Sequence, residues 1–127
     1  MLEKLYNFYQ NKKLKLKSLS HGEYSKTLER NFNIKLYNSQ LIASESIAEG
    51  NITEVETGQG KTFIAFLSAC NVFKKGIYKK IFIATSNDYL AQRDCEHLFN
   101  SYKDENIKAG FVTQTRDEGK VYKRCSR

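Results

Sequence analysis

At 127 residues, with 40% hydrophobic residues and a formal net charge of +7, the chain has the length of one domain with a buried core. Its three cysteines are far apart and form no Cys-x-x-Cys pair, so we expect reduced cysteines rather than a zinc site or a disulfide framework. No apolar run is long enough to span a bilayer, and the first residues lack the features of a signal peptide, so a cytoplasmic protein is expected.

The N-terminal residues 1–35 are expected to form a helical, basic segment. Leu2, Leu5, Tyr6 and Tyr9 recur at helical spacing, and lysines interleaved with leucines follow up to Leu19. Such a segment either lies on an acidic membrane surface or packs on its own domain. Basic residues also dominate 116–127, and basic ends are typical of contacts with acidic lipid, nucleic acid or acidic protein, as well as of solvated surface. Further helices are expected over 23–32 and 39–49.

A phosphate-binding loop is predicted at Thr57-Gly58-Gln59-Gly60-Lys61-Thr62. Its glycines let backbone N–H groups approach phosphate oxygens, its lysine supplies a positive charge, and its last threonine supplies a hydroxyl ligand for Mg²⁺. The flanks fit this interpretation. Residues 52–56 place Ile52 and Val55 among polar residues, as in a half-buried strand, and 61–73 contain no Pro or Gly and suit a buried helix.

The remaining chain predicts two more strands and one more helix. Residues 80–85 form a short run rich in β-branched and aromatic types, typical of a buried strand. A helix capped by Ser86, Asn87 or Asp88 is expected to extend to about Tyr102, and a third strand to cover 107–112. Strands alternating with helices predict an α/β fold. We therefore expect a partial P-loop (RecA-like) parallel sheet with flanking helices in a partial nucleotide-binding domain over 36–127.

Three blocks together resemble the SecA family of preprotein translocase ATPases. Residues 37–42 (YNSQLI) are similar to the family's F-D-V-Q-L-L, and 52–62 (ITEVETGQGKT) to I-A-E-M-R-T-G-E-G-K-T. Residues 85–94 (TSNDYLAQRD) resemble T-V-N-D-Y-L-A-Q-R-D, which is close to a family signature. The loop block alone fits many helicase-like ATPases, whereas the three blocks in this spacing point to the first nucleotide-binding domain of SecA.

The resemblance implies that ATP and Mg²⁺ are the ligands of this domain. Gln40 would recognise the adenine edge through an amide that both donates and accepts. Thr62 would contact the metal held by the nucleotide. The implied partners are the SecYEG channel, preproteins and acidic phospholipid, and the implied location is cytoplasmic or peripheral on the inner face of the cell membrane. The expected nucleotide-binding residues are Gln40, Thr57, Gly58, Gln59, Gly60, Lys61 and Thr62.

Two departures from the family pattern bear on activity. Glu56 stands where the family usually has arginine, which places a negative charge near an anionic ligand. The family's acidic motif, which helps to hold Mg²⁺ and to position water, is not matched, and only Asp117 and Glu118 follow the third expected strand. We therefore assign no catalytic residue and expect binding without efficient hydrolysis. The alternatives are a superfamily 2 nucleic-acid helicase-like domain and a non-catalytic nucleotide-binding remnant.

Overall fold

A computed structural model of the chain describes residues 22–115 and 119–124, so the helix expected over 2–19 lies outside the described residues. The chain divides into two compact units, residues 1–80 and 81–127. A boundary between residues 35 and 36 stays a prediction. Within the described ranges, no helix is long and apolar enough to cross a membrane.

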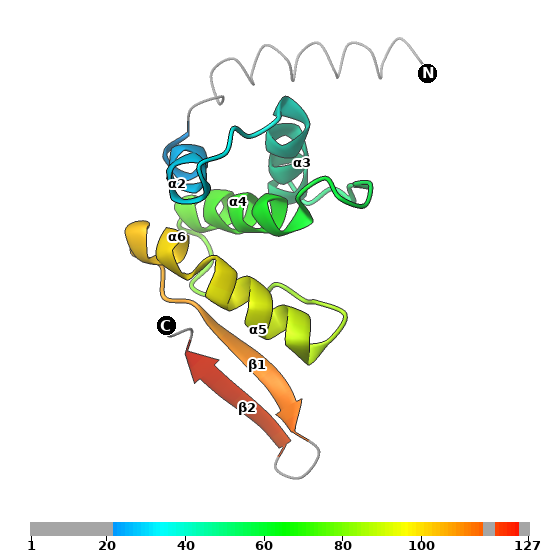
Figure 1. The fold of residues 1–127 in the computed structure, drawn as a ribbon, viewed down its shortest axis with the longest axis vertical. Coiled ribbons are helices and arrows are strands. Elements are labelled where there is room, and N and C mark those ends of the chain that lie inside the picture. The colour runs from blue at the N-terminus through cyan, green and yellow to red at the C-terminus, as the bar shows by residue number, and fades with distance from the viewer. Residues whose placement is uncertain (1–21, 116–118, 125–127) are drawn as a thin grey trace. The chain divides into compact units, whose positions relative to one another are not determined.

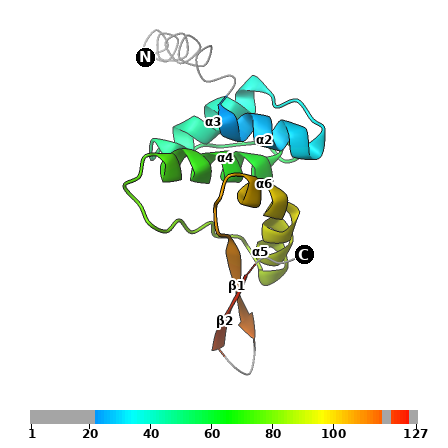
Figure 2. The same cartoon turned by 90° about the vertical axis from the view of Figure 1, so that its left-hand side faces the viewer.

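The first unit consists of three described helices: α2 (Glu23–Phe32), α3 (Asn38–Ala48) and α4 (Lys61–Lys74). The sequence predicted the bounds of all three to within one residue. Helix α4 packs against both α3 and α2, and the views in Figure 1 and Figure 2 show this arrangement of the three helices. Its largely apolar sequence, free of Pro and Gly, suits an element covered by neighbours on more than one side.

The core of this unit contains side chains of both α2 and α4. Leu28 of α2 and Phe66 and Cys70 of α4 are fully buried. The rings of Phe32 and Phe63 add an aromatic contact, with centroids 4.9 Å apart and planes inclined by 58°. Burial of large apolar side chains is the main favourable contribution here, so the position of α4 is fixed by its packing.

Polar contacts join both ends of α3 to neighbouring helices. The Glu29 carboxylate of α2 accepts a hydrogen bond from the Leu36 N–H at 3.0 Å, which ties down the connection into α3. At the other end, the Lys75 ammonium donates to the Ala48 carbonyl at 2.9 Å. A cation at the last carbonyls of a helix complements the helix dipole, so this contact holds the end of α4 near the end of α3.

The second unit contains α5 (Asp88–His97), α6 (Phe99–Asp104), β1 (Gly110–Thr115) and β2 (Gly119–Arg124). The helix expected up to Tyr102 is interrupted at Leu98, which is buried and separates α5 from α6. The strands pair antiparallel, with Gly110 opposite Arg124 and Thr115 opposite Gly119. Cys95 of α5 and Phe111 of β1 form the centre of a small apolar cluster.

The expected parallel sheet is absent from the described residues, which are mostly helical with one two-stranded antiparallel sheet. Residues 52–56 and 80–85 form no strand, so the two strands predicted there are wrong. A parallel strand is stable only with hydrogen-bonded neighbours and covering helices. Here Ile52 is fully exposed and Phe82 is 85% exposed. The third predicted strand does form, three residues later than expected, and pairs with β2, which the sequence did not indicate.

The cysteines differ from one another. Cys70 forms no disulfide and is completely buried in α4, where it packs as a small apolar side chain. Cys95 is disulfide-bonded. The expectation of uniformly reduced cysteines is therefore wrong for Cys95.

Candidate nucleotide-binding site

The predicted phosphate-binding loop connects residues 51–56, which have no regular secondary structure, to α4. Gly58 and Gly60 have φ angles of +84° and +74°, a left-handed conformation that other residues adopt only at a cost. The Gln59 N–H donates to the Glu56 carbonyl at 3.4 Å, which closes a tight turn. The backbone of this turn therefore favours glycine at both positions, whereas the close approach of a phosphate to them stays a prediction.

The loop ends at the start of α4, where Gly60 is the N-cap residue. The Gly60 carbonyl accepts from the N–H groups of Phe63 and Ile64 at 3.0 and 3.2 Å, so the helix is well formed from its first turn. The first N–H groups of a helix have no intrahelical acceptor, and the helix dipole adds partial positive charge there. Lys61 is exposed at this end and contributes a full positive charge. The arrangement suits an anion such as a phosphate group.

Gln40 of α3 lies against this loop. Its Nε2 donates to the Gln59 carbonyl at 3.1 Å, and its Oε1 accepts from the Tyr37 N–H at 2.9 Å. The residue is only 6% exposed. A Cβ atom on Gly60 would come within 2.5 Å of the Gln40 Nε2, so the amide lies directly under the last glycine of the loop.

The residues present fit a magnesium ion held jointly with a nucleotide. Thr62 is the second residue of α4 and offers a hydroxyl oxygen, the hard type of ligand that Mg²⁺ prefers. Among the described residues there is no group of three or more His, Cys, Asp or Glu able to hold a metal by itself. Thr62 would therefore supply one oxygen, with phosphate and water oxygens supplying the others, which is usual for this ion.

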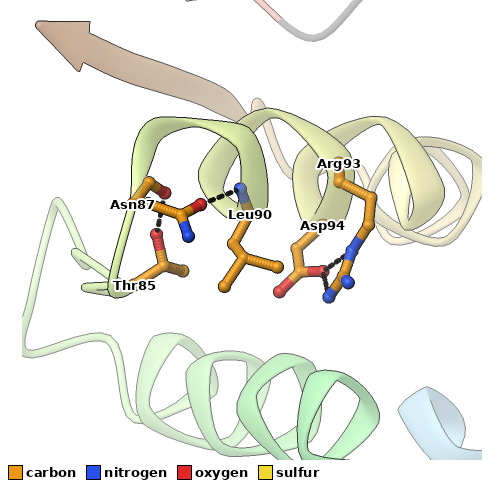
Figure 3. Close-up of polar contacts among 5 residues, drawn as sticks. All are labelled: Thr85, Asn87, Leu90, Arg93 and Asp94. Carbon is orange, nitrogen blue, oxygen red and sulfur yellow. Dashed lines mark hydrogen bonds and ion pairs between the residues drawn. The ribbon is translucent and has the colours of Figure 1, made fainter.

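The block 85–94 contains the start of α5. The Asn87 side chain accepts from the Leu90 N–H at 2.9 Å and caps α5, and the Thr85 hydroxyl donates to the Asn87 carbonyl at 3.0 Å (Figure 3). Arg93 and Asp94 form an ion pair at 2.6 Å on the same helix (Figure 3). Of the three residues considered as the cap, Asn87 is the one used.

Comparison with known proteins identifies the family. The family model described as the SecA DEAD-like domain matches residues 5–124, nearly the whole chain. The chain belongs to the SecA family. The DEAD-like domain suggests a RecA-like fold for this family member, although the parallel sheet is absent from its described residues.

Several curated relatives share the name Protein translocase subunit SecA. The one from Helicobacter hepaticus is 33% identical over 113 residues, which are 86% of this chain and 13% of the relative. Those from Ehrlichia chaffeensis and Clostridium botulinum are each 38% identical, over 70% and 66% of this chain and 10% of each relative. The chain thus spans about a tenth of the length of these SecA proteins. No solved structure matches it.

The structure of this SecA-family chain brings the predicted nucleotide-binding residues together. Gln40 is 17 or more positions from the loop in sequence, yet its amide contacts the loop at Gln59. Their roles as ligands stay predictions. The contact between Gln40 and the Tyr37 N–H could not be predicted from the sequence, because a helix-capping box is recognised by Ser or Thr at the first position and Tyr37 is neither.

Proposed function

We propose that residues 57–62 bind the phosphates of Mg·ATP. The observation that supports this most strongly is the loop with two left-handed glycines that opens directly onto the exposed N-terminal end of α4. Backbone N–H groups at this end would donate to phosphate oxygens, and the Lys61 ammonium would compensate their charge. The Thr62 hydroxyl would contact Mg²⁺. In a RecA-like fold these residues would stand at the edge of the sheet, between a strand and the helix that follows it.

We further propose that these residues correspond to the nucleotide-binding part of a motor for preprotein translocation. The support is family membership and the name shared by the relatives. Such a motor would act with the SecYEG channel on preproteins, in the cytoplasm or on the inner face of the membrane. Acidic phospholipid is the proposed partner of residues 1–19. Deleting them should abolish co-sedimentation with anionic liposomes, and binding that survives the deletion would contradict this proposal.

The direct test of nucleotide binding is calorimetric titration of Mg·ATP into the chain and two variants. Lys61→Ala removes a charge-assisted contact and should weaken binding by about 1.5–3 kcal/mol, which is roughly tenfold or more in affinity. Lys74→Ala is the matched control, because it removes the same charge from the last turn of the same helix. Salt screens the charge of Lys74 over the length of the helix, so its removal should have little effect on phosphate binding at the loop.

The two variants separate a local contact from a general effect of charge. Weaker binding in Lys61→Ala with unchanged binding in Lys74→Ala supports the proposed site. Equal losses in both variants would mean that the nucleotide responds only to the positive charge of the chain. Equal affinity of wild type and Lys61→Ala would refute the phosphate-binding loop.

A further inference from the structure

An exposed basic turn with two apolar residues at its tip begins at the end of α4. All residues from 73 to 80 (FKKGIYKK) are exposed, and a pair of lysines stands on each side of Ile77 and Tyr78. Ile77 is 71% exposed and Tyr78 is 57% exposed. A contiguous run of exposed large apolar side chains of this kind is typical of an interaction surface. We call residues 73–80 the lysine turn.

The lysine turn is held at its base. The Lys75 ammonium donates to the Ala48 carbonyl at 2.9 Å, and the Gly76 N–H donates to the Phe73 carbonyl at 3.0 Å. Gly76 has a φ angle of +69°, and a Cβ placed on it would meet no atom within 4 Å. The two apolar residues follow directly after this glycine, so they are presented to solvent from a defined backbone.

The charge around the lysine turn has a single sign. Residues 57–87 contain five lysines and no Asp or Glu. Among the described residues, no acidic side chain pairs with Lys74, Lys79 or Lys80. Their positive charges are therefore not compensated within this part of the protein, and together they favour an anionic partner.

The chemistry of the lysine turn fits an anionic membrane surface better than a nucleic acid. Its polar side chains are four lysines and one tyrosine, with no Asn, Gln, Arg, Ser or Thr for reading base edges. Its most exposed apolar side chain, Ile77, is aliphatic and does not stack on a base as an aromatic ring does. Aliphatic and tyrosine side chains enter the interfacial layer of a bilayer, and neighbouring lysines reach the headgroups.

We propose that the lysine turn is a membrane contact, in which Ile77 and Tyr78 enter the interfacial layer of a bilayer and the lysines bind anionic headgroups. A single contact of this size binds a membrane only marginally, and stable binding takes two. The lysine turn therefore adds to the contact proposed above for residues 1–19 and rests on that part of the proposed function. It is separate from the proposed nucleotide site, because it lies at the opposite end of α4 from the phosphate-binding loop.

The chain contains no tryptophan, which permits a direct test. Tyr78→Trp introduces a single fluorophore at the tip of the turn. Tyr89→Trp is the matched control, because Tyr89 is 72% exposed and follows Asp88 at the start of α5. On vesicles of phosphatidylcholine and phosphatidylglycerol, the emission of Tyr78→Trp should shift to shorter wavelength and be quenched by brominated lipid. Tyr89→Trp should keep the emission of a hydrated indole, and phosphatidylcholine alone should shift neither variant.

Co-sedimentation of the full chain with the same anionic vesicles measures what each part of the turn contributes. Lys79→Gln/Lys80→Gln should weaken binding by about ten- to thirtyfold at low salt, since each lysine near an anionic surface contributes about fivefold. Lys26→Gln/Lys35→Gln removes the same net charge from two exposed positions elsewhere in the first unit and should bind nearly like the wild type. Ile77→Ser should weaken binding by about three- to tenfold, and this loss should persist as salt is raised.

Three results would overturn the proposal. The first is an unshifted emission of Tyr78→Trp on vesicles that the chain binds. The second is an equal loss in the two double-lysine variants, which would show attraction by net charge alone. The third is binding of poly(U) that depends on Lys79 and Lys80 while vesicle binding does not, which would identify a nucleic acid as the partner.

The same measurements separate this proposal from the contact proposed for residues 1–19. Failure of the wild type to bind anionic vesicles would refute both. Deletion of residues 1–19 without loss of binding, together with a shifted emission of Tyr78→Trp, would refute only the contact of those residues. Loss of binding on that deletion, with no shift for Tyr78→Trp in the full chain, would refute only the contact of the lysine turn.

Discussion

Replacing each loop glycine with alanine should show how strongly the loop depends on Gln40. Gly58 and Gly60 both have left-handed φ angles, +84° and +74°. Alanine in this conformation is destabilised by roughly 1–2 kcal/mol, so the backbone contribution is similar at the two positions. The surroundings differ. A Cβ on Gly58 would meet no atom within 4 Å, whereas one on Gly60 would come within 2.5 Å of the Gln40 Nε2.

The end of a glutamine side chain can usually move aside, but this one is held by hydrogen bonds. Displacing Gln40 in Gly60→Ala breaks its bond to Gln59, and a buried amide or carbonyl left without a partner is destabilised by about 1–3 kcal/mol. The Phe63 ring, 3.5 Å from the added Cβ, remains in ordinary contact and adds little. We therefore expect Gly60→Ala to lower the free energy of unfolding by about 1–3 kcal/mol more than Gly58→Ala does.

Urea denaturation followed by circular dichroism measures this difference. Gly58→Ala is the control for the backbone contribution, and the pair Gln40→Ala and Gln40→Ala/Gly60→Ala completes a double-mutant cycle. In the Gln40→Ala background, Gly60→Ala should be no more destabilising than Gly58→Ala is in the wild type. Two results would refute this reasoning. Gly60→Ala could prove no more destabilising than Gly58→Ala in the wild type, or its additional destabilisation could remain in the Gln40→Ala background.

Three further predictions concern charge, capping and turnover. Glu56→Gln should raise affinity for Mg·ATP by roughly two- to threefold in calorimetry, because it removes a negative charge that repels the phosphates. Added salt should reduce this gain in affinity, and a gain that is independent of salt would contradict the electrostatic cause. Asn87→Ala should lower the free energy of unfolding, measured in urea, by about 1 kcal/mol, whereas Asn87→Asp should retain most of the wild-type stability because aspartate also caps helices. Equal losses of stability in the two variants would exclude capping as the role of Asn87. A polypeptide of these 127 residues should show no steady phosphate release, since a loop alone does not orient the attacking water, and turnover abolished by Lys61→Ala would overturn this expectation.

The helices were predictable because their determinants are local. The expected range 23–32 coincides with α2, and the run without Pro or Gly from Lys61 to Phe73 becomes α4 with one more residue. Asn87, one of three candidates for a cap, has a side chain that accepts from an N–H three residues later, a relation readable from short-range spacing. In each case the hydrogen bonds that stabilise the element lie within one or two turns of the sequence.

The strands were not predictable in the same way, since a strand is stabilised by segments distant in sequence. The run at 80–85 has suitable residue types, but side-chain type indicates a preference for a pleated, half-buried surface and supplies no pairing partner. In the structure this segment is unpaired and Phe82 is largely exposed. The partner strand β2 falls where the sequence is polar and basic, a composition that gave no reason to expect a strand.

The candidate site shows the same division between local and distant determinants. The left-handed glycines and the start of α4 follow from six consecutive residues, whereas the position of Gln40 depends on how α3 packs on α4. A glutamine amide suits an adenine edge and a backbone carbonyl equally well, so residue type does not distinguish the two roles. Reduced ATP binding in a Gln40 variant would therefore be no evidence of base recognition by itself. Only a change in the preference for ATP over GTP would show that, because a displaced loop weakens the binding of every phosphate ligand alike.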